Sequence, residues 1–109
     1  MTTQEVASMI NSIGLPYSYY QFNADTAQPP PFICFFYPEN DDFLADNTNY
    51  LKVYRLVIEL YTDSKDFELE SRVEAVLTQN GLVFTREETP LDDERMFEVI
   101  YNTEVIIDV

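Results

Sequence analysis

The 109-residue sequence contains no histidine and no tryptophan, and it has one cysteine and two glycines. Without histidine there is no imidazole to act as a general base, to join a hydrolytic triad or to complete a common zinc site. Gly14 and Gly81 each follow an amphipathic stretch, so neither belongs to a phosphate-binding loop or a dinucleotide-binding fingerprint. We therefore expect no enzymatic activity and no cofactor.

Basic residues are also scarce, because 6 Lys and Arg stand against 20 Asp and Glu, for a formal net charge of −14. The basic residues are scattered between Lys52 and Arg95 and form no stripe that would neutralise phosphates. A field of this sign repels nucleic acid and anionic membranes. We expect neither as a binding partner.

Long apolar runs are missing as well. No segment approaches the roughly 18 uninterrupted apolar residues of a membrane span, and the first residues lack a basic region followed by an apolar one. The single cysteine, Cys34, has no second cysteine to pair with and lies in the apolar run Phe32–Phe36, where we expect it to be buried. These features predict a soluble, intracellular protein.

Apolar residues nevertheless make up 46% of the chain, and 8 Tyr with 8 Phe supply most of the bulk. This content is too high for a disordered chain. A length of 109 residues suits one domain that buries roughly two-thirds of its unfolded surface. We expect a single domain over residues 1–109.

Two helices are indicated by apolar residues at helical spacing. The first has a capping box at Thr2 and Glu5 and ends at Gly14. The second is expected to be capped by Asp63 or Ser64 and to end at Asn80–Gly81. Their apolar stripes are Val6, Met9, Ile10 and Ile13 in the first, and Leu69, Val73, Val76 and Leu77 in the second.

The remaining apolar segments read as strands. The longest places Tyr54, Leu56, Ile58 and Leu60 on one face by alternation. The order α-β-β-β-α-β-β predicts an α+β fold, with a mostly antiparallel sheet of four or five strands and two amphipathic helices. The expected strands are Tyr17–Phe22, Phe32–Tyr37, Tyr50–Thr62, Leu82–Arg86 and Arg95–Ile107.

Three segments between these elements are candidate protein contacts: a proline-rich arm over Asn23–Pro31, an acidic loop over Glu39–Asn49 and an acidic turn over Glu87–Glu94. Apolar anchors within a polar rim are typical of interfaces. The adjacent carboxylates could also hold a divalent ion, but the calcium-loop pattern is missing, so we expect solvated loops and no metal. The candidate interface residues are Pro29, Pro30, Pro31, Asp41, Asp42, Phe43, Leu44, Asp46, Asp92 and Asp93.

Tyrosines gather in two groups, Tyr17, Tyr19 and Tyr20 near the first helix, and Tyr50, Tyr54 and Tyr61 on the long strand. Stacking platforms for nucleic acid are accompanied by cations, which are missing here. The tyrosines are therefore expected at the edge of the core or in a protein–protein interface.

The segment Asn40–Glu74 resembles the tail terminator proteins of long-tailed phages and prophages of Gram-positive bacteria. The run Ile58–Asp63 followed by a charged helix carries most of this resemblance, and Gly14-Leu15-Pro16 and the closing Thr103–Ile106 also fit. The resemblance implies a virion protein of the neck, assembled in the host cytoplasm. It implies a ring of six copies that caps the head-proximal end of the tail tube, contacts a head connector or completion protein, and lets DNA pass without specific binding.

Other interpretations remain open. The chain could be another neck or head completion protein of a phage. It could also be an acidic inhibitor that mimics DNA, although that role calls for acids spread over a regular face, and many acids here lie in predicted loops. An enzyme using carboxylates and a divalent ion is the third alternative, and the lack of histidine weighs against it.

Overall fold

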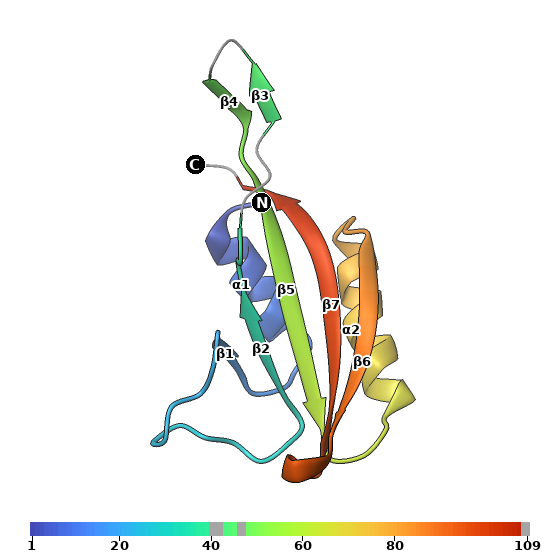
Figure 1. Cartoon of the computed structure of the whole chain (residues 1–109). Helices are drawn as coiled ribbons and strands as arrows, with labels where there is room; N and C mark the ends of the chain where they lie inside the picture. Colours follow the sequence, from blue (N-terminus) through green and yellow to red (C-terminus); the bar gives the residue numbers. More distant parts are fainter. Residues whose placement is uncertain (40–42, 46–47, 108–109) are drawn as a thin grey trace.

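The computed structural model describes residues 1–39, 43–45 and 48–107. One sheet of five strands, in the order β1-β2-β5-β7-β6, carries two helices (Figure 1). The predicted α+β class, the mostly antiparallel sheet and the order of these elements are confirmed. The elements are α1 (Thr3–Asn11), β1 (Tyr17–Tyr19), β2 (Phe32–Phe36), β3 (Phe43–Ala45), β4 (Thr48–Leu51), β5 (Val53–Thr62), α2 (Phe67–Gln79), β6 (Phe84–Leu91), the 3-10 turn η1 (Asp92–Glu94) and β7 (Met96–Ile106).

Helix α1 begins with the predicted capping box. The Thr2 hydroxyl accepts from the Glu5 backbone N–H at 3.0 Å, and the Glu5 carboxylate accepts from the Thr2 N–H at 2.9 Å. These contacts satisfy two N–H groups that have no partner within the helix. The helix ends before Gly14, whose φ of +87° suits glycine.

Helix α2 begins later than predicted. Asp66, and neither Asp63 nor Ser64, is its N-cap, because the Asp66 carboxylate accepts from the Leu69 N–H at 3.0 Å. Aspartate and serine side chains can both cap a helix, so the sequence alone did not show which of these three residues is the N-cap. The predicted exit at Asn80–Gly81 is confirmed, with φ of +75° at Gly81.

Both helices cover the same face of the sheet. Their buried side chains form one cluster with the inward side chains of β2, β5 and β7. Alternation along β5 places Leu56, Ile58 and Leu60 in this core, as predicted, and antiparallel pairing sets Ile58 opposite Tyr101 of β7. No helix of the described residues lies on the opposite face of the sheet, which is called the helix-free face below.

The last two strands form a longer antiparallel pair than predicted. Strand β6 runs through Leu91, so Glu87–Leu91 belong to a strand, and the acidic turn shrinks to η1. Pro90 is accommodated because β6 is an edge strand, where proline's missing N–H breaks no sheet hydrogen bond.

A further difference concerns the segment predicted as the loop Glu39–Asn49. Strands β3 and β4 lie within and beside it and pair with each other in a separate two-stranded sheet. This β3–β4 hairpin extends beyond the end of the main sheet, while η1 lies at the opposite end (Figure 1). The predicted strand Tyr50–Thr62 is therefore divided at Lys52 into β4 and β5.

Candidate assembly surfaces

The β3–β4 hairpin contains two of the predicted contact residues, Phe43 and Leu44, which lie in β3. Asp41, Asp42 and Asp46 lie outside the described residues. At the base of the hairpin, the Arg55 guanidinium forms an ion pair with Glu39 at 2.6 Å, and the Arg55 N–H donates to the Glu39 carbonyl at 3.0 Å. These two contacts fix where the chain leaves the main sheet.

The proline-rich arm forms an exposed segment between β1 and β2. At its start, the Asn23 side-chain oxygen accepts from the Asp25 and Thr26 N–H groups, each at 2.9 Å. At its end lie Pro29, Pro30 and Pro31, of which Pro29 and Pro31 are exposed and the Pro30–Pro31 peptide bond is cis. The arm is thus held at its start by a local turn and presents prolines to solvent.

Asp92 and Asp93 are exposed in η1. This turn lies at the end of the molecule opposite the β3–β4 hairpin (Figure 1). The predicted contact residues therefore do not form one surface. Those that the structure describes are distributed over β3, the arm and the far turn.

A fourth surface is the outer edge of β1, where three large aromatic side chains are exposed. Tyr17, Tyr19 and Tyr20 are 37%, 53% and 60% exposed. The Tyr19 ring meets Phe35 edge-on at 5.5 Å, and the Tyr20 ring meets Phe36 at 5.5 Å. Each ring thus rests on β2 while its remaining surface faces solvent, as predicted for tyrosines at a core edge or interface.

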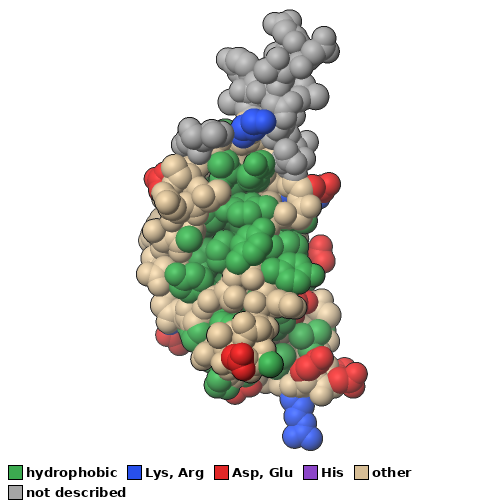
Figure 2. Space-filling view, turned by 90° about the vertical axis from the view of Figure 1, so that its left-hand side faces the viewer, with side chains coloured by type: hydrophobic (Ala, Val, Ile, Leu, Met, Phe, Trp, Pro, Cys, Tyr) green, Lys and Arg blue, Asp and Glu red, His purple; other side chains and the backbone are tan. Residues whose placement is uncertain are grey.

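Figure 2 shows the side of the molecule on which β1 lies. Hydrophobic side chains form a continuous area in the middle of this side, and acidic side chains lie below this area and toward the outline. Continuous apolar surface that is rimmed by polar groups marks interaction sites. Tyr17, Tyr19 and Tyr20 have the exposure that an interface requires, whereas Tyr54 and Tyr61 of the second group are half-buried.

The helix-free face carries a pair of carboxylates that the sequence analysis missed. Glu59 of β5 and Glu98 of β7 are diagonal neighbours, because Glu59 pairs with Ile100 and Tyr61 pairs with Glu98. The Tyr61 hydroxyl donates to Glu98 at 2.6 Å. Burial, then a hydrogen bond with Glu98 and the charge of Glu98, raise the pKa of Glu59 to about 7. The signal in the sequence was that both glutamates occupy outward positions of strands.

Cys34 lies beside this pair, opposite Glu59 in the neighbouring strand β2. The side chain is 4% exposed, which confirms the predicted burial. Burial and the charge of Glu59 raise the pKa of the thiol to about 11. The thiol is therefore protonated and shielded, which is the state of an unreactive cysteine.

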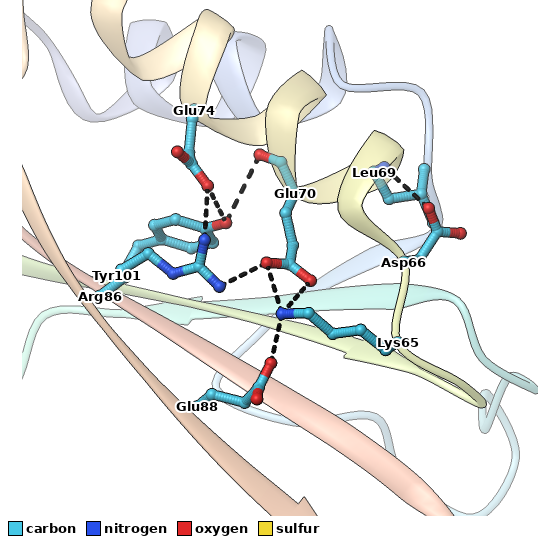
Figure 3. A network of polar contacts seen from close by, with 8 residues as sticks. All are labelled: Lys65, Asp66, Leu69, Glu70, Glu74, Arg86, Glu88 and Tyr101. Carbon is cyan, nitrogen blue, oxygen red and sulfur yellow. Dashed lines mark hydrogen bonds and ion pairs between the residues drawn. The ribbon is translucent and has the colours of Figure 1, made fainter.

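A second polar cluster joins α2 to the sheet (Figure 3). The carboxylate of Glu70 is 3% exposed and forms ion pairs with Lys65, at 2.8 Å, and with Arg86. Arg86 also reaches Glu74 at 3.2 Å, and the Tyr101 hydroxyl donates to Glu74 at 2.9 Å. Two cations neutralise the buried charge, so removing one partner would leave an uncompensated charge in the interior. Glu70 and Glu74 of α2 thus face Arg86 of β6.

Within the described part of the chain, no group of three or more Cys, Asp or Glu side chains has the arrangement of a metal site. No helix among the described residues has the length and apolarity to cross a membrane.

Neither a protein-family model nor a curated protein sequence matches this chain. Among solved structures, the fold is similar to that of a chain in the virion of a native gene transfer agent particle. The TM-score is 0.51 at 15% sequence identity, and the match covers 95% of this chain and 88% of the other. At this identity the match shows a shared fold.

Proposed function

We propose that this chain is a structural protein of a phage-like virion, specifically a tail terminator that forms a ring on the head-proximal end of the tail tube and joins it to the head. The observation that carries the proposal is the fold shared, over 95% of the chain, with a chain of a gene transfer agent virion. The resemblance of Asn40–Glu74 to tail terminators makes the role specific.

The distribution of surfaces supports a ring. Subunits of a ring contact each other head to tail, so every subunit needs two different surfaces that fit each other. The β3–β4 hairpin and the aromatic edge of β1 are two such different surfaces in one chain. The arm and η1, at other places on the molecule, are available for the tube and head proteins.

The charges suit a channel through which DNA passes. Arg55, Lys65 and Arg86 pair with carboxylates, and Arg72 donates to the Ile13 carbonyl. Most of the few cations are thus engaged within the chain, whose net charge is −14. A surface of this sign repels phosphates and provides no specific DNA contacts.

The proposal is tested by light scattering and negative-stain electron microscopy of the purified protein, alone and with the tail tube protein of the same phage. Repulsion between acidic subunits is screened over a Debye length of about 8 Å at physiological ionic strength, so added salt should favour rings. We expect rings at high salt, and tubes capped at one end. A strict monomer at high salt and with tube protein present contradicts the proposal.

The same samples separate the alternative neck role. A head completion protein would bind the head connector and leave the length of tail tubes unchanged. A tail terminator limits tube growth, so tube length against the ratio of the two proteins decides between them.

A further inference from the structure

The two edges of the main sheet differ in a way that affects assembly. Edge strands offer unpaired backbone groups, and proteins usually protect them with charges, prolines or a covering element. Strand β6 follows this rule, with exposed Arg86, Glu87, Glu88 and Pro90. The segment Tyr17–Phe22, which contains β1 at the other edge, has neither a charged residue nor a proline.

The β1 edge is also free of pairing in the part of the chain that the structure describes, since β1 pairs with β2 alone. Its backbone groups on the outer side, apart from the Tyr19 carbonyl, which accepts from the Gln21 N–H at 2.8 Å, can therefore accept another strand, as in β-strand addition. Exposed tyrosines flank this edge and add aromatic contact area with hydroxyl donors at the tips.

The β3–β4 hairpin is the complementary element. In the described residues its strands pair only with each other, outside the main sheet. A two-stranded hairpin by itself is marginally stable in water and gains stability from packing against another structure. Its sequence includes Phe43 and Leu44, and acidic residues flank these two.

Charge selects which surface of another copy can receive this hairpin. Each copy carries a net charge of −14, so an acid-flanked hairpin is repelled wherever carboxylates are exposed. The side of the molecule on which β1 lies presents apolar side chains in its middle, and acidic side chains lie below this apolar area and toward the outline (Figure 2). Tyrosine hydroxyls there can donate to carboxylates instead of repelling them.

We propose that the β3–β4 hairpin of one copy docks on the β1 edge, Tyr17–Phe22, of the next copy. This inference rests on the proposed ring and names the contact that builds it. Because hairpin and edge are different surfaces of one chain, the contact repeats from subunit to subunit and closes when the rotation allows.

The test uses two variants that each lose one half of the contact. The hairpin variant carries Phe43→Ser and Leu44→Ser, and the edge variant carries Tyr19→Asp. A second edge variant, Tyr20→Asp, guards against misfolding, because aspartate tolerates the left-handed backbone at this residue, where φ is 67°. The matched control is Val83→Asp, which adds the same charge at an apolar residue that is 89% exposed and precedes the other edge strand.

Association is measured by sedimentation velocity at a salt concentration where the unaltered protein assembles, after circular dichroism has shown that each variant is folded. We expect each half-contact variant to associate at least about tenfold more weakly. The Val83→Asp control should assemble like the unaltered protein. A mixture of the hairpin variant with an edge variant should form heterodimers and nothing larger, since one intact hairpin then meets one intact edge.

The outcomes separate this inference from the proposed function. If the unaltered protein forms rings and folded variants form them too, the docking is wrong and the ring stands. If both variants are monomeric and their mixture also stays monomeric, the two surfaces do not contact each other, and the inference is overturned. If the unaltered protein never assembles, even with tube protein, the proposed ring itself is wrong.

Discussion

Replacing Glu59 by glutamine should make this domain more stable at neutral and alkaline pH. Glu59 and Glu98 are diagonal neighbours on the helix-free face. Burial and the contact with Glu98 raise the pKa of Glu59 from its ordinary value of 4.5 to about 7. Above that pH the folded state must hold a second negative charge beside Glu98, whereas a glutamine amide can donate to Glu98 without ionising.

The direction in which stability changes with pH follows from proton binding to Glu59. Between pH 4.5 and about 7 the folded state binds more protons at Glu59 than the unfolded state does, so stability falls as pH rises through this window. A shift of this size corresponds to about 3 kcal/mol at full effect. Solvent reaches part of the half-buried side chain, so we expect the variant to gain about 1–3 kcal/mol at about pH 8 and almost nothing at about pH 5.

The two other titratable groups that face Glu59, Tyr61 and Cys34, do not change their protonation state in this pH range. Burial raises the pKa of Tyr61, and burial with the charge of Glu59 raises that of Cys34 to about 11. Both side chains therefore stay protonated from pH 5 to 8. The titration that separates the variant from the unaltered protein is therefore that of Glu59.

The assay is urea unfolding followed by far-ultraviolet circular dichroism at several pH values, at a protein concentration low enough to prevent assembly. Glu87→Gln is the matched control, because Glu87 is exposed in β6 and lies in the same row of the sheet, opposite Ile100. It removes one charge from the whole molecule without touching the pair. If the stability difference between the two variants does not grow from pH 5 to pH 8, the reasoning is refuted.

Three further changes should separate core, ion-pair and assembly roles. Glu70→Ala should lower the free energy of unfolding by about 1–3 kcal/mol, because Lys65 and Arg86 lose their buried partner; in urea unfolding, Glu68→Ala on the exposed side of α2 should cost clearly less. Cys34→Ala should cost about 1 kcal/mol and leave ring formation intact, and fast labelling of native Cys34 by a thiol reagent would contradict its burial. Phe43→Ala should weaken assembly by about 1–3 kcal/mol with a nearly unchanged melting temperature of the monomer; a monomer that melts several degrees lower and still forms rings would show that the residue has a structural role.

Much of the fold could be predicted because its signals are local. A capping box needs only Thr2 and Glu5, three residues apart, and a left-handed helix exit needs only Gly81. Alternation along β5 and the apolar run around Cys34 likewise identified which side chains are buried. This information lies in the spacing of residues within one segment and does not depend on contacts between segments.

The tertiary structure decided what depends on pairing between distant segments. Strand β6 continues through Pro90 because β7 supplies its partner, and the end of β6 cannot be read from its acidic sequence. Glu70 is buried because Lys65 and Arg86 converge on it, and Glu59 meets Glu98 through the register of β5 with β7. The contrast between the aromatic β1 edge and the charged β6 edge likewise exists only once the strand order is set, because an edge is a property of the sheet and not of any one strand.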